Sequence, residues 1–323
     1  MLARTAEYLF WAGRYLERAD QTARLLDVTY HRLLEAPPSE RAVAWDEALA
    51  LVALAEEYGP RPMTADAVTR YLVLDSANPG SIVAAVEQVR DNARGVREHL
   101  SVELWEAVNS FCLELRARDL PAELDQHPHQ FYGFIRRQCQ GIVGVANATW
   151  ARDDGWRFFT MGSFLERAEL TTRLVRVRHP RHGPDDRHEG YATLRIGSGL
   201  QAHRRRYHGS FEATSIVELL LLSPQLPRST LFCLREASAV LNQLDPNASR
   251  RSARLLGRLR ARMEYLDPGE LLRGDLAGEL RSVEVEILRV CDAIGGEYFG
   301  GRHDLGLHSL QLAPVGPDRG PPR

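Results

Sequence analysis

Apolar side chains recur every three or four positions along the first part of the chain. Between residues 3 and 34 this spacing links a stripe of leucines and alanines, namely Leu9, Ala12, Leu16, Ala19, Ala23, Leu26 and Leu33. A repeat near 3.6 residues places these side chains on one face of an α-helix. Because proline cannot continue a helix, the Ala36-Pro37-Pro38 segment should end it. The pattern therefore predicts one helix roughly 45 Å long.

The same spacing continues through the rest of the chain and predicts further helices, separated by short segments rich in proline, glycine and aspartate. The expected ranges are 41–58, 64–74, 80–98, 101–118, 128–150, 156–178, 190–207, 213–222, 228–244, 248–266 and 270–298. Ser81 and Ser101 stand where a side-chain oxygen can cap a helix N-terminus. No stretch alternates apolar and polar residues long enough to predict a strand, so the expected fold class is all-α.

Two segments of the chain resemble each other closely. Residues 10–28 read FWAGRYLERADQTARLLDV and residues 159–177 read FTMGSFLERAELTTRLVRV, with ten identities in nineteen positions. Residues 63–86 match residues 211–234 in the same way and pair Ser81 with Ser229. The two matches have nearly the same offset, which indicates that one order of elements runs through both halves.

This duplication predicts the domain organisation. We expect a helical bundle built from two pseudo-symmetric repeats of about 150 residues, 1–150 and 151–302, which together form one compact domain. The two long helices that carry the repeated Glu-Arg pairs should pack against each other. The tail at 303–323 is rich in proline and glycine and is expected to be largely disordered.

Composition and charge exclude several kinds of catalytic and binding site. All 41 basic residues are arginines, and the absence of lysine excludes a lysine Schiff base and the phosphate-binding lysine of a Walker A loop. The formal net charge of −2 gives no general attraction to nucleic acid or anionic lipid. Charges interrupt the apolar N-terminus, and no uncharged stretch reaches the length of a signal peptide or membrane span. The four widely spaced cysteines are typical of buried free thiols, so we expect a cytoplasmic protein.

A group of charged residues recurs on the two long helices and is the main candidate site. On the first helix its members lie three, four and seven positions apart, which gathers them on one side. The members are Arg14, Glu17, Arg18, Gln21 and Arg24 in the first copy, and Glu166, Arg167 and Arg173 in the second. The second copy has Ser163 at the position of Arg14, so the two copies are not identical.

Three interpretations of this group stay open. In the first, Glu17 and Glu166 each neutralise an arginine buried between the two helices, because buried charges need partners. In the second, the arginines form an anion pocket, since a guanidinium binds carboxylate or phosphate through two hydrogen bonds. In the third, Glu17 with Asp20 and Glu166 with Glu169 bind two metal ions. The histidines that such carboxylate bundles use are missing at the required spacing, so we predict no metal and no cofactor.

The predicted helix at 80–98 carries a second group of charges. Arg90, Arg94 and Arg97 share one face of it, which is typical of a solvated surface and also suits an acidic partner. Asn92 is turned from this face by about 160°. Because asparagine is a poor helix former, we expect Asn92 to cap a neighbouring group or to bind something.

Three separated motifs together resemble one known protein family. They are MLARTAEYLFWAGRYLERADQTARLLDV at the N-terminus, DSANPGSIVAAVEQVRDNARGVREHLSVELWEAVN from residue 75, and GSFLERAELTTRL from residue 162. The family is Alpha-E, a bacterial all-helical domain of unknown function named for its conserved glutamate. The chain departs from it at Ser163, where the second copy often has arginine, and in the arginine- and histidine-bearing loop at 179–190. The resemblance implies a partner, because such proteins are typically encoded beside, or fused to, circularly permuted ATP-grasp proteins, with transglutaminase-like proteases nearby.

The residues and the resemblance leave three functional hypotheses. The first is a non-catalytic helical partner or substrate-binding subunit of an ATP-grasp peptide or amide ligase, with an acidic peptide as a candidate substrate. The second is an independent enzyme that uses Glu17 or Glu166, although nearby arginines lower the pKa of a carboxylate and weaken it as a base. The third is a structural scaffold, which includes a homo-oligomer. We assign no catalytic residue, and the candidate ligand- or partner-binding residues are Arg14, Glu17, Arg18, Arg24, Arg90, Asn92, Arg94, Glu166, Arg167 and Arg173.

Overall fold

The computed structural model describes residues 1–34, 37–178 and 187–300, and these residues form helices and connecting turns without a strand. The all-α prediction is therefore confirmed. The first half contains α1 (Ala3–Leu34), α2 (Pro38–Leu51), α3 (Ala55–Tyr58), α4 (Ala65–Val73), α5 (Ile82–Gly95), the 3-10 turn η1 (Arg97–His99), α6 (Val102–Ala117), α7 (Leu120–Gln126) and α8 (Pro128–Thr149). The second half contains α9 (Asp154–Arg178), α10 (Arg187–Ile196), α11 (Leu200–Tyr207), α12 (Ala213–Val217), the π-helical turn η3 (Glu218–Leu222), α13 (Thr230–Leu244), α14 (Arg251–Glu264), α15 (Pro268–Arg273) and α16 (Leu276–Tyr298).

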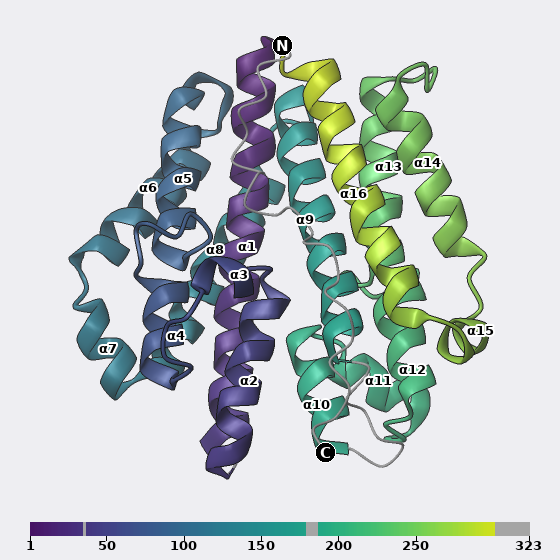
Figure 1. Cartoon of the computed structure of the whole chain (residues 1–323). Helices are drawn as coiled ribbons and strands as arrows, with labels where there is room; N and C mark the ends of the chain where they lie inside the picture. The colour runs from purple at the N-terminus through teal and green to yellow at the C-terminus, as the bar shows by residue number, and fades with distance from the viewer. Residues whose placement is uncertain (35–36, 179–186, 301–323) are drawn as a thin grey trace.

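The two longest helices, α1 and α9, lie side by side in the middle of the molecule (Figure 1). Helices α5 and α8 pack on α1, whereas α13 and α16 pack on α9. The buried apolar side chains of both halves belong to one continuous cluster. The expected packing of the two Glu-Arg helices is thus confirmed.

Glycines allow α1 and α9 to approach with their backbones in contact. A Cβ atom added at Gly13 would lie 2.1 Å from the Phe159 carbonyl oxygen, and one at Gly162 would lie 2.1 Å from the Phe10 carbonyl oxygen. Real Cβ atoms do not come this close to a backbone atom, and a backbone atom cannot rotate away as a side chain can. Only glycine fits at these two positions as the helices now lie.

Several predicted helices are divided in the structure. The range 41–58 is split into α2 and α3 at Ala53, which has a φ of 57°, and the range 190–207 into α10 and α11 at Ser198, with a φ of 53°. These left-handed residues end one helix before the next begins, and apolar spacing alone does not reveal them. The range 270–298 is likewise divided into α15 and α16, because Asp275 caps a new helix through the Gly278 amide (2.9 Å).

Helix ends follow side-chain capping. The Oγ atoms of Ser81 and Ser101 accept hydrogen bonds from the amides of Ala84 and Leu104, both at 3.2 Å, as the sequence predicted. Helix α7 was not predicted, because its seven residues are too few to show a period. Helix α5 ends at Gly95, before the predicted end at residue 98.

The predicted boundary near residue 150 falls in the turn between α8 and α9. Superposition of the two halves stays a prediction. The four cysteines are buried free thiols, as expected. None of the described helices combines the length and apolar character needed to cross a bilayer. The predicted tail at 303–323 lies outside the described residues, as do positions 179–186 of the loop at 179–190.

Candidate functional site

Glu166 on α9 lies at the centre of a group of buried charges. Its carboxylate accepts hydrogen bonds from Arg14 (Nε to Oε2, 2.5 Å) and from Arg18 (Nε to Oε1, 2.7 Å). About one turn along α9, Glu169 accepts hydrogen bonds from Arg14 (Nη2 to Oε2, 2.8 Å) and from Arg173 (Nη2 to Oε1, 2.6 Å). The Arg14 side chain has no exposed surface. This arginine therefore joins two buried acids across the interface of α1 and α9.

The row of charges continues to α16. Glu284 accepts hydrogen bonds from Arg173 (Nε to Oε2, 3.1 Å) and from Arg176 (Nε to Oε1, 2.5 Å). Arginines and acids alternate in this row, which we call the Glu166 chain: Arg18, Glu166, Arg14, Glu169, Arg173, Glu284 and Arg176. The row begins and ends with arginine, so its acids leave one positive charge unbalanced.

A second row surrounds Glu17 on α1. The Glu17 carboxylate accepts hydrogen bonds from Arg167 (Nη2 to Oε2, 2.6 Å) and from Arg228 (Nη1 to Oε1, 2.8 Å). Arg228 also donates to Asp20 (Nη2 to Oδ2, 2.5 Å), which accepts a further hydrogen bond from Arg24 (Nη2 to Oδ2, 3.0 Å). We call these five residues the Glu17 chain, and it too begins and ends with arginine.

One pair of contacts occurs in both directions across the helix interface. Arg18 of α1 binds Glu166 of α9, and Arg167 of α9 binds Glu17 of α1. These are the repeated Glu-Arg pairs of the sequence. Each glutamate is thus neutralised from the opposite helix, which agrees with the interpretation of these pairs as interface ion pairs.

The bridging arginine comes from a different element in each chain. Arg14 bridges the acids of the Glu166 chain from α1 itself. The second copy has Ser163 at this position, and its hydroxyl donates to the Gly13 carbonyl oxygen (3.1 Å). On the Glu17 side Arg228 makes the bridge from the turn before α13. Arg228 was not predicted from the sequence. The available signal was that the second copy has Ser163 where the first copy has Arg14.

The two central glutamates are strong acids in the folded chain. Burial alone would raise the pKa of Glu17, but the positive charges of Arg167 and Arg228 outweigh burial and lower the pKa to about 2. Burial likewise opposes ionisation of Glu166, and its two arginine partners lower its pKa to about 2. Carboxylates with such pKa values hold no proton at neutral pH and are poor general bases.

Stability should therefore fall in acid. Both carboxylates have a folded pKa of about 2 against an ordinary 4.5. A depressed folded pKa contributes stability above pH 4.5 and loses it as the pH falls toward 2. We expect the urea midpoint of unfolding to be flat from pH 8 to 6 and to fall steeply between pH 5 and 3. Glu166→Gln should start from a lower midpoint and fall less steeply. A midpoint that stays constant down to pH 3 would contradict these shifts.

The nearby thiols are not nucleophiles either. Burial raises the pKa of Cys291 to about 12, and it does the same for Cys233, although neighbouring arginines oppose the change. A thiol with this pKa is protonated at neutral pH, and the thiolate is the reactive form. Both central pairs considered as metal ligands, Glu17 with Asp20 and Glu166 with Glu169, are instead bound to arginines.

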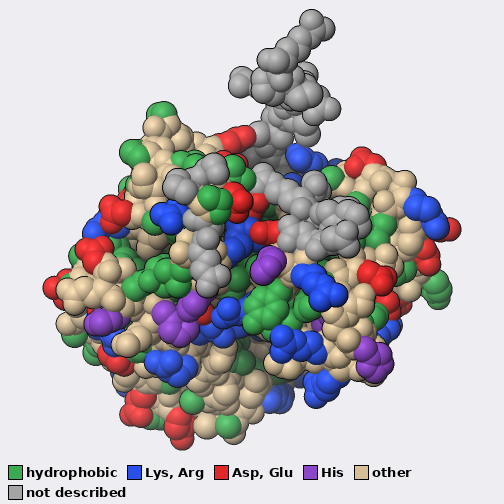
Figure 2. Space-filling view, turned by 90° about the horizontal axis from the view of Figure 1, so that it is seen from below, with side chains coloured by type: hydrophobic (Ala, Val, Ile, Leu, Met, Phe, Trp, Pro, Cys, Tyr) green, Lys and Arg blue, Asp and Glu red, His purple; other side chains and the backbone are tan. Residues whose placement is uncertain are grey.

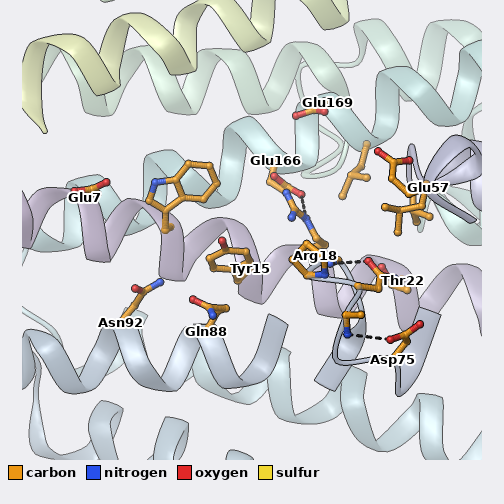
Figure 3. Close-up of a pocket in the computed structure, with 18 of the residues that line it drawn as sticks. Glu7, Tyr15, Arg18, Thr22, Glu57, Asp75, Gln88, Asn92, Glu166 and Glu169 are labelled. Carbon is orange, nitrogen blue, oxygen red and sulfur yellow. Dashed lines mark hydrogen bonds and ion pairs between the residues drawn. The ribbon is translucent and has the colours of Figure 1, made fainter. Parts of the chain in front are cut away.

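A cavity of about 910 Å³ is lined by four members of the Glu166 chain, namely Arg18, Glu166, Glu169 and Arg173. It lies between α1, α5, α9 and the segments that flank α3 and follow α4. Figure 3 shows Tyr15 and Arg18 on α1, with Gln88 and Asn92 pointing from α5 toward them and Glu166 on the other side. Asn92, the mid-helix asparagine, thus lines a cavity, and its binding of a ligand stays a prediction.

The loop before α5 lines one side of the cavity. In the match between residues 63–86 and 211–234, the residue aligned with Arg228 is Gly80, which also lines the cavity. Arg228 bonds to Glu17, whereas Gly80 has no side chain, and a Cβ atom added there would meet Leu54 Cδ1 at 3.1 Å. Asn78 fixes the turn, because its Nδ2 donates to the Tyr71 carbonyl oxygen (3.0 Å) and its Oδ1 accepts from the Gly80 amide (2.9 Å).

The structure separates the arginines of α5 from this site. Arg90 donates to Asn109 on α6 (Nε to Oδ1, 2.8 Å), so it links two helices. Arg94 is 65% exposed and pairs only with Asp91 (3.5 Å) among the described residues. Arg97 lies in η1 over the Trp105 ring (5.2 Å). The predicted shared face is therefore interrupted at the end of α5.

One cluster contains the side-chain types that hold metals. Ligand atoms of Asp27, His31 and His129 all lie within 4.8 Å of one another. The His129 Nδ1 is 2.6 Å from the Asp27 Oδ1, and Arg136 donates to the other oxygen (3.2 Å). Asp27 is therefore already neutralised by an arginine. Sequence spacing did not predict this cluster, because His129 comes from α8.

The surface seen from below, where α1 and α9 end and α2 and α10 begin, carries both signs of charge. Figure 2 shows arginine and acidic side chains scattered over this face, with histidines among them. Nucleic-acid binding generally uses a continuous basic surface. The expectation that nucleic acid is not a partner stays a prediction.

Comparison with known proteins gives a family and three relatives. The Alpha-E family model, described as a predicted alpha-helical domain with a conserved ER motif, matches residues 1–299. Uncharacterized proteins of Mycobacterium bovis and Mycobacterium tuberculosis strain CDC 1551 are each 28% identical over 318 residues, and one of strain H37Rv is 27% identical. Each match covers 88% of this chain and 36% of the relative, so the chain spans about a third of their length. No solved structure matches it.

Proposed function

The chain belongs to the Alpha-E family, and we propose that it is a non-catalytic subunit that holds a substrate for an ATP-grasp peptide or amide ligase. One observation carries this proposal. The cavity of about 910 Å³ opens on a row of buried charges that ends at Arg18. A volume of this size suits a small ligand, and fixed charges at its wall can orient one.

The chemistry of the ligation would belong to the partner. Nucleotide is commonly held by a lysine and a glycine-rich phosphate loop, and this chain has no lysine. Glu166 at the cavity wall is bound to two arginines that lower its pKa to about 2, so it is poorly suited to act as a base. These properties support binding over catalysis and make the independent-enzyme hypothesis the weaker one.

The family context supports a partner. The resemblance to Alpha-E proteins implies an ATP-grasp neighbour, and the matched relatives are much longer than this chain. A domain that forms a third of a longer protein is suited to work beside other domains. We place the partner-binding surface on the exposed side of α5, around Arg94, because arginine is enriched at interfaces and Arg94 is 65% exposed.

Association with the ATP-grasp protein encoded next to this chain should be measurable and salt-dependent. Binding that uses exposed charges weakens as salt screens them. We expect Arg94→Ala to weaken association several-fold, and Arg18→Ala to leave association intact while lowering ATP-dependent ligation. Calorimetry and a coupled ADP assay measure the two effects. Arg258→Ala, at an exposed arginine of α14, is the matched control.

Two outcomes would refute the proposed function. The first is ATP hydrolysis by this chain alone, which would place the chemistry here. The second is the absence of both association and any effect on ligation at low salt. Loss of association in Arg258→Ala as well would instead move the interface away from α5.

A further inference from the structure

The Glu166 chain lacks an anion at one end. Its seven members alternate between arginine and glutamate, and the row stops at Arg18 beside the cavity. The Arg18 side chain is 19% exposed, and its Nε bond to Glu166 is its only hydrogen bond within the described ranges. A guanidinium has five N–H donors. Several N–H donors of Arg18 therefore have no acceptor among the described residues. A bound anion would accept from them and continue the alternation of the row.

A second arginine at the cavity also lacks an acidic partner. Arg61 lines the cavity and lies over the rings of Tyr71 (4.8 Å) and Tyr58 (5.6 Å). Among the residues that the structure describes, no carboxylate lies within ion-pair distance of it. Its Nη1 donates to the Glu57 carbonyl oxygen (3.4 Å), and a guanidinium stacked on aromatic rings can bind a carboxylate through its other N–H groups.

The other lining groups suit amide bonds. Gln88 and Asn92 present side-chain amides, each of which can donate to a carbonyl and accept from an N–H. The Trp11 Nε1 is buried and has no hydrogen-bond partner in the described part of the chain. Such a donor is costly to leave unpaired, and a ligand carbonyl would satisfy it. The ring of Tyr15 adds an apolar wall.

Acids line both ends of the cavity, with Glu7 at the end where Asn92 lies. Figure 3 shows Glu57 and Asp75 toward one end of the cavity and Asn92 toward the other, with Arg18 between them. The cavity therefore presents carboxylates to a cationic group of a ligand as well as arginines to an anionic group. Inorganic phosphate would use the arginines but would have no N–H or carbonyl group for the two side-chain amides.

We propose that this cavity binds a short peptide through its free carboxylate, with Arg18 and Arg61 as anchors and Gln88 and Asn92 holding its amide groups. This rests on the proposed function and specifies its substrate class. A carboxylate at Arg18 extends the alternating row by one anion, and its bonds to guanidinium are charge-assisted. The cavity volume of about 910 Å³ accommodates a peptide of a few residues.

The test uses the purified chain and a library of tripeptides with free carboxylates, beside the same library with C-terminal amides. Peptides retained by the protein are identified by mass spectrometry, and their affinities are measured by calorimetry. We expect retention from the free-carboxylate library and about tenfold or greater weakening on amidation, since a charge-assisted bond exceeds the 1.4 kcal/mol that a tenfold change represents. Inorganic phosphate should compete only weakly.

Single substitutions test which arginines bind the peptide carboxylate. Arg18→Gln and Arg61→Gln should each weaken peptide binding about tenfold or more, and Arg258→Gln on α14 should not change it. Circular dichroism checks that Arg18→Gln folds, because Arg18 also binds Glu166. Arg61→Gln removes no ion pair found in the described residues. This variant therefore still tests the proposal if Arg18→Gln does not fold.

Three results would overturn the inference: no peptide retained, equal retention of the amidated library, or tighter binding of phosphate than of any peptide. Unchanged binding in Arg61→Gln and Arg18→Gln would overturn the assigned anchors. Because these measurements use the chain alone, they do not depend on the ATP-grasp neighbour. A chain that binds peptides but no neighbour would refute the proposed function and leave this inference intact.

Discussion

Replacing Arg14 by alanine should destabilise the chain by about 3–5 kcal/mol, the usual effect of breaking a buried ion pair by removing one partner. Arg14 has no exposed side-chain surface and bonds to Glu166 and Glu169. Without it both carboxylates stay buried and each loses one of its two arginines. The free energy of unfolding from urea titration, followed by circular dichroism, measures the loss.

Two further variants separate charge from general disruption. Arg14→Lys keeps the positive charge but cannot reach both acids as a guanidinium does, so we expect an intermediate loss. Arg258→Ala should stay within about 0.5 kcal/mol of the wild type, because Arg258 is exposed. A loss below about 1 kcal/mol for Arg14→Ala would mean that the ion-pair row contributes little to stability.

Gly162→Ala should destabilise the chain by about 3 kcal/mol, toward the upper end for inserting a methyl group into a packed interface. The new Cβ would meet the Phe10 carbonyl oxygen at 2.1 Å. This clash is relieved only if α1 and α9 move apart. Such a movement would also lengthen the ion pairs that join the two helices. Thermal and urea unfolding of the purified variant measure the change.

Gly144→Ala on α8 is the matched control. A Cβ at Gly144 would meet nothing within 4 Å, and alanine is a better helix former than glycine by about 0.5–1 kcal/mol. The same substitution should therefore stabilise the chain at residue 144 and destabilise it at residue 162. Similar effects at both positions would show that the close contact of α1 and α9 is not needed.

The sequence predicts much of the fold because helical spacing and proline are local signals. The internal repeat also predicts that α1 and α9 are partners, since Glu17-Arg18 and Glu166-Arg167 stand at matching positions. The breaks at Ala53 and Ser198 were missed. They depend on left-handed residues that are neither glycine nor proline, and composition does not mark them.

The site was only partly predictable. Arg228 contacts Glu17 across 211 positions of sequence, and Glu284 contacts Arg173 across 111. No local period connects such residues. Asp20 and Glu169 drew attention as metal ligands because their spacing from Glu17 and Glu166 fits a helix face, yet spacing does not say which cation lies opposite. The tertiary fold supplies arginines there.

The dependence of α1 on α9 has a consequence for synthesis on the ribosome. Arg14, Glu17 and Arg18 are made long before their main partners at 166 and 167. At about 5–20 residues per second, a gap of this length lasts roughly 10–30 s. During that time the nascent first half has charged groups on α1 that nothing yet neutralises, and burying them alone would be costly. We expect α1 to reach its native packing only after α9 has left the ribosome. The central pair of helices would then form late in translation.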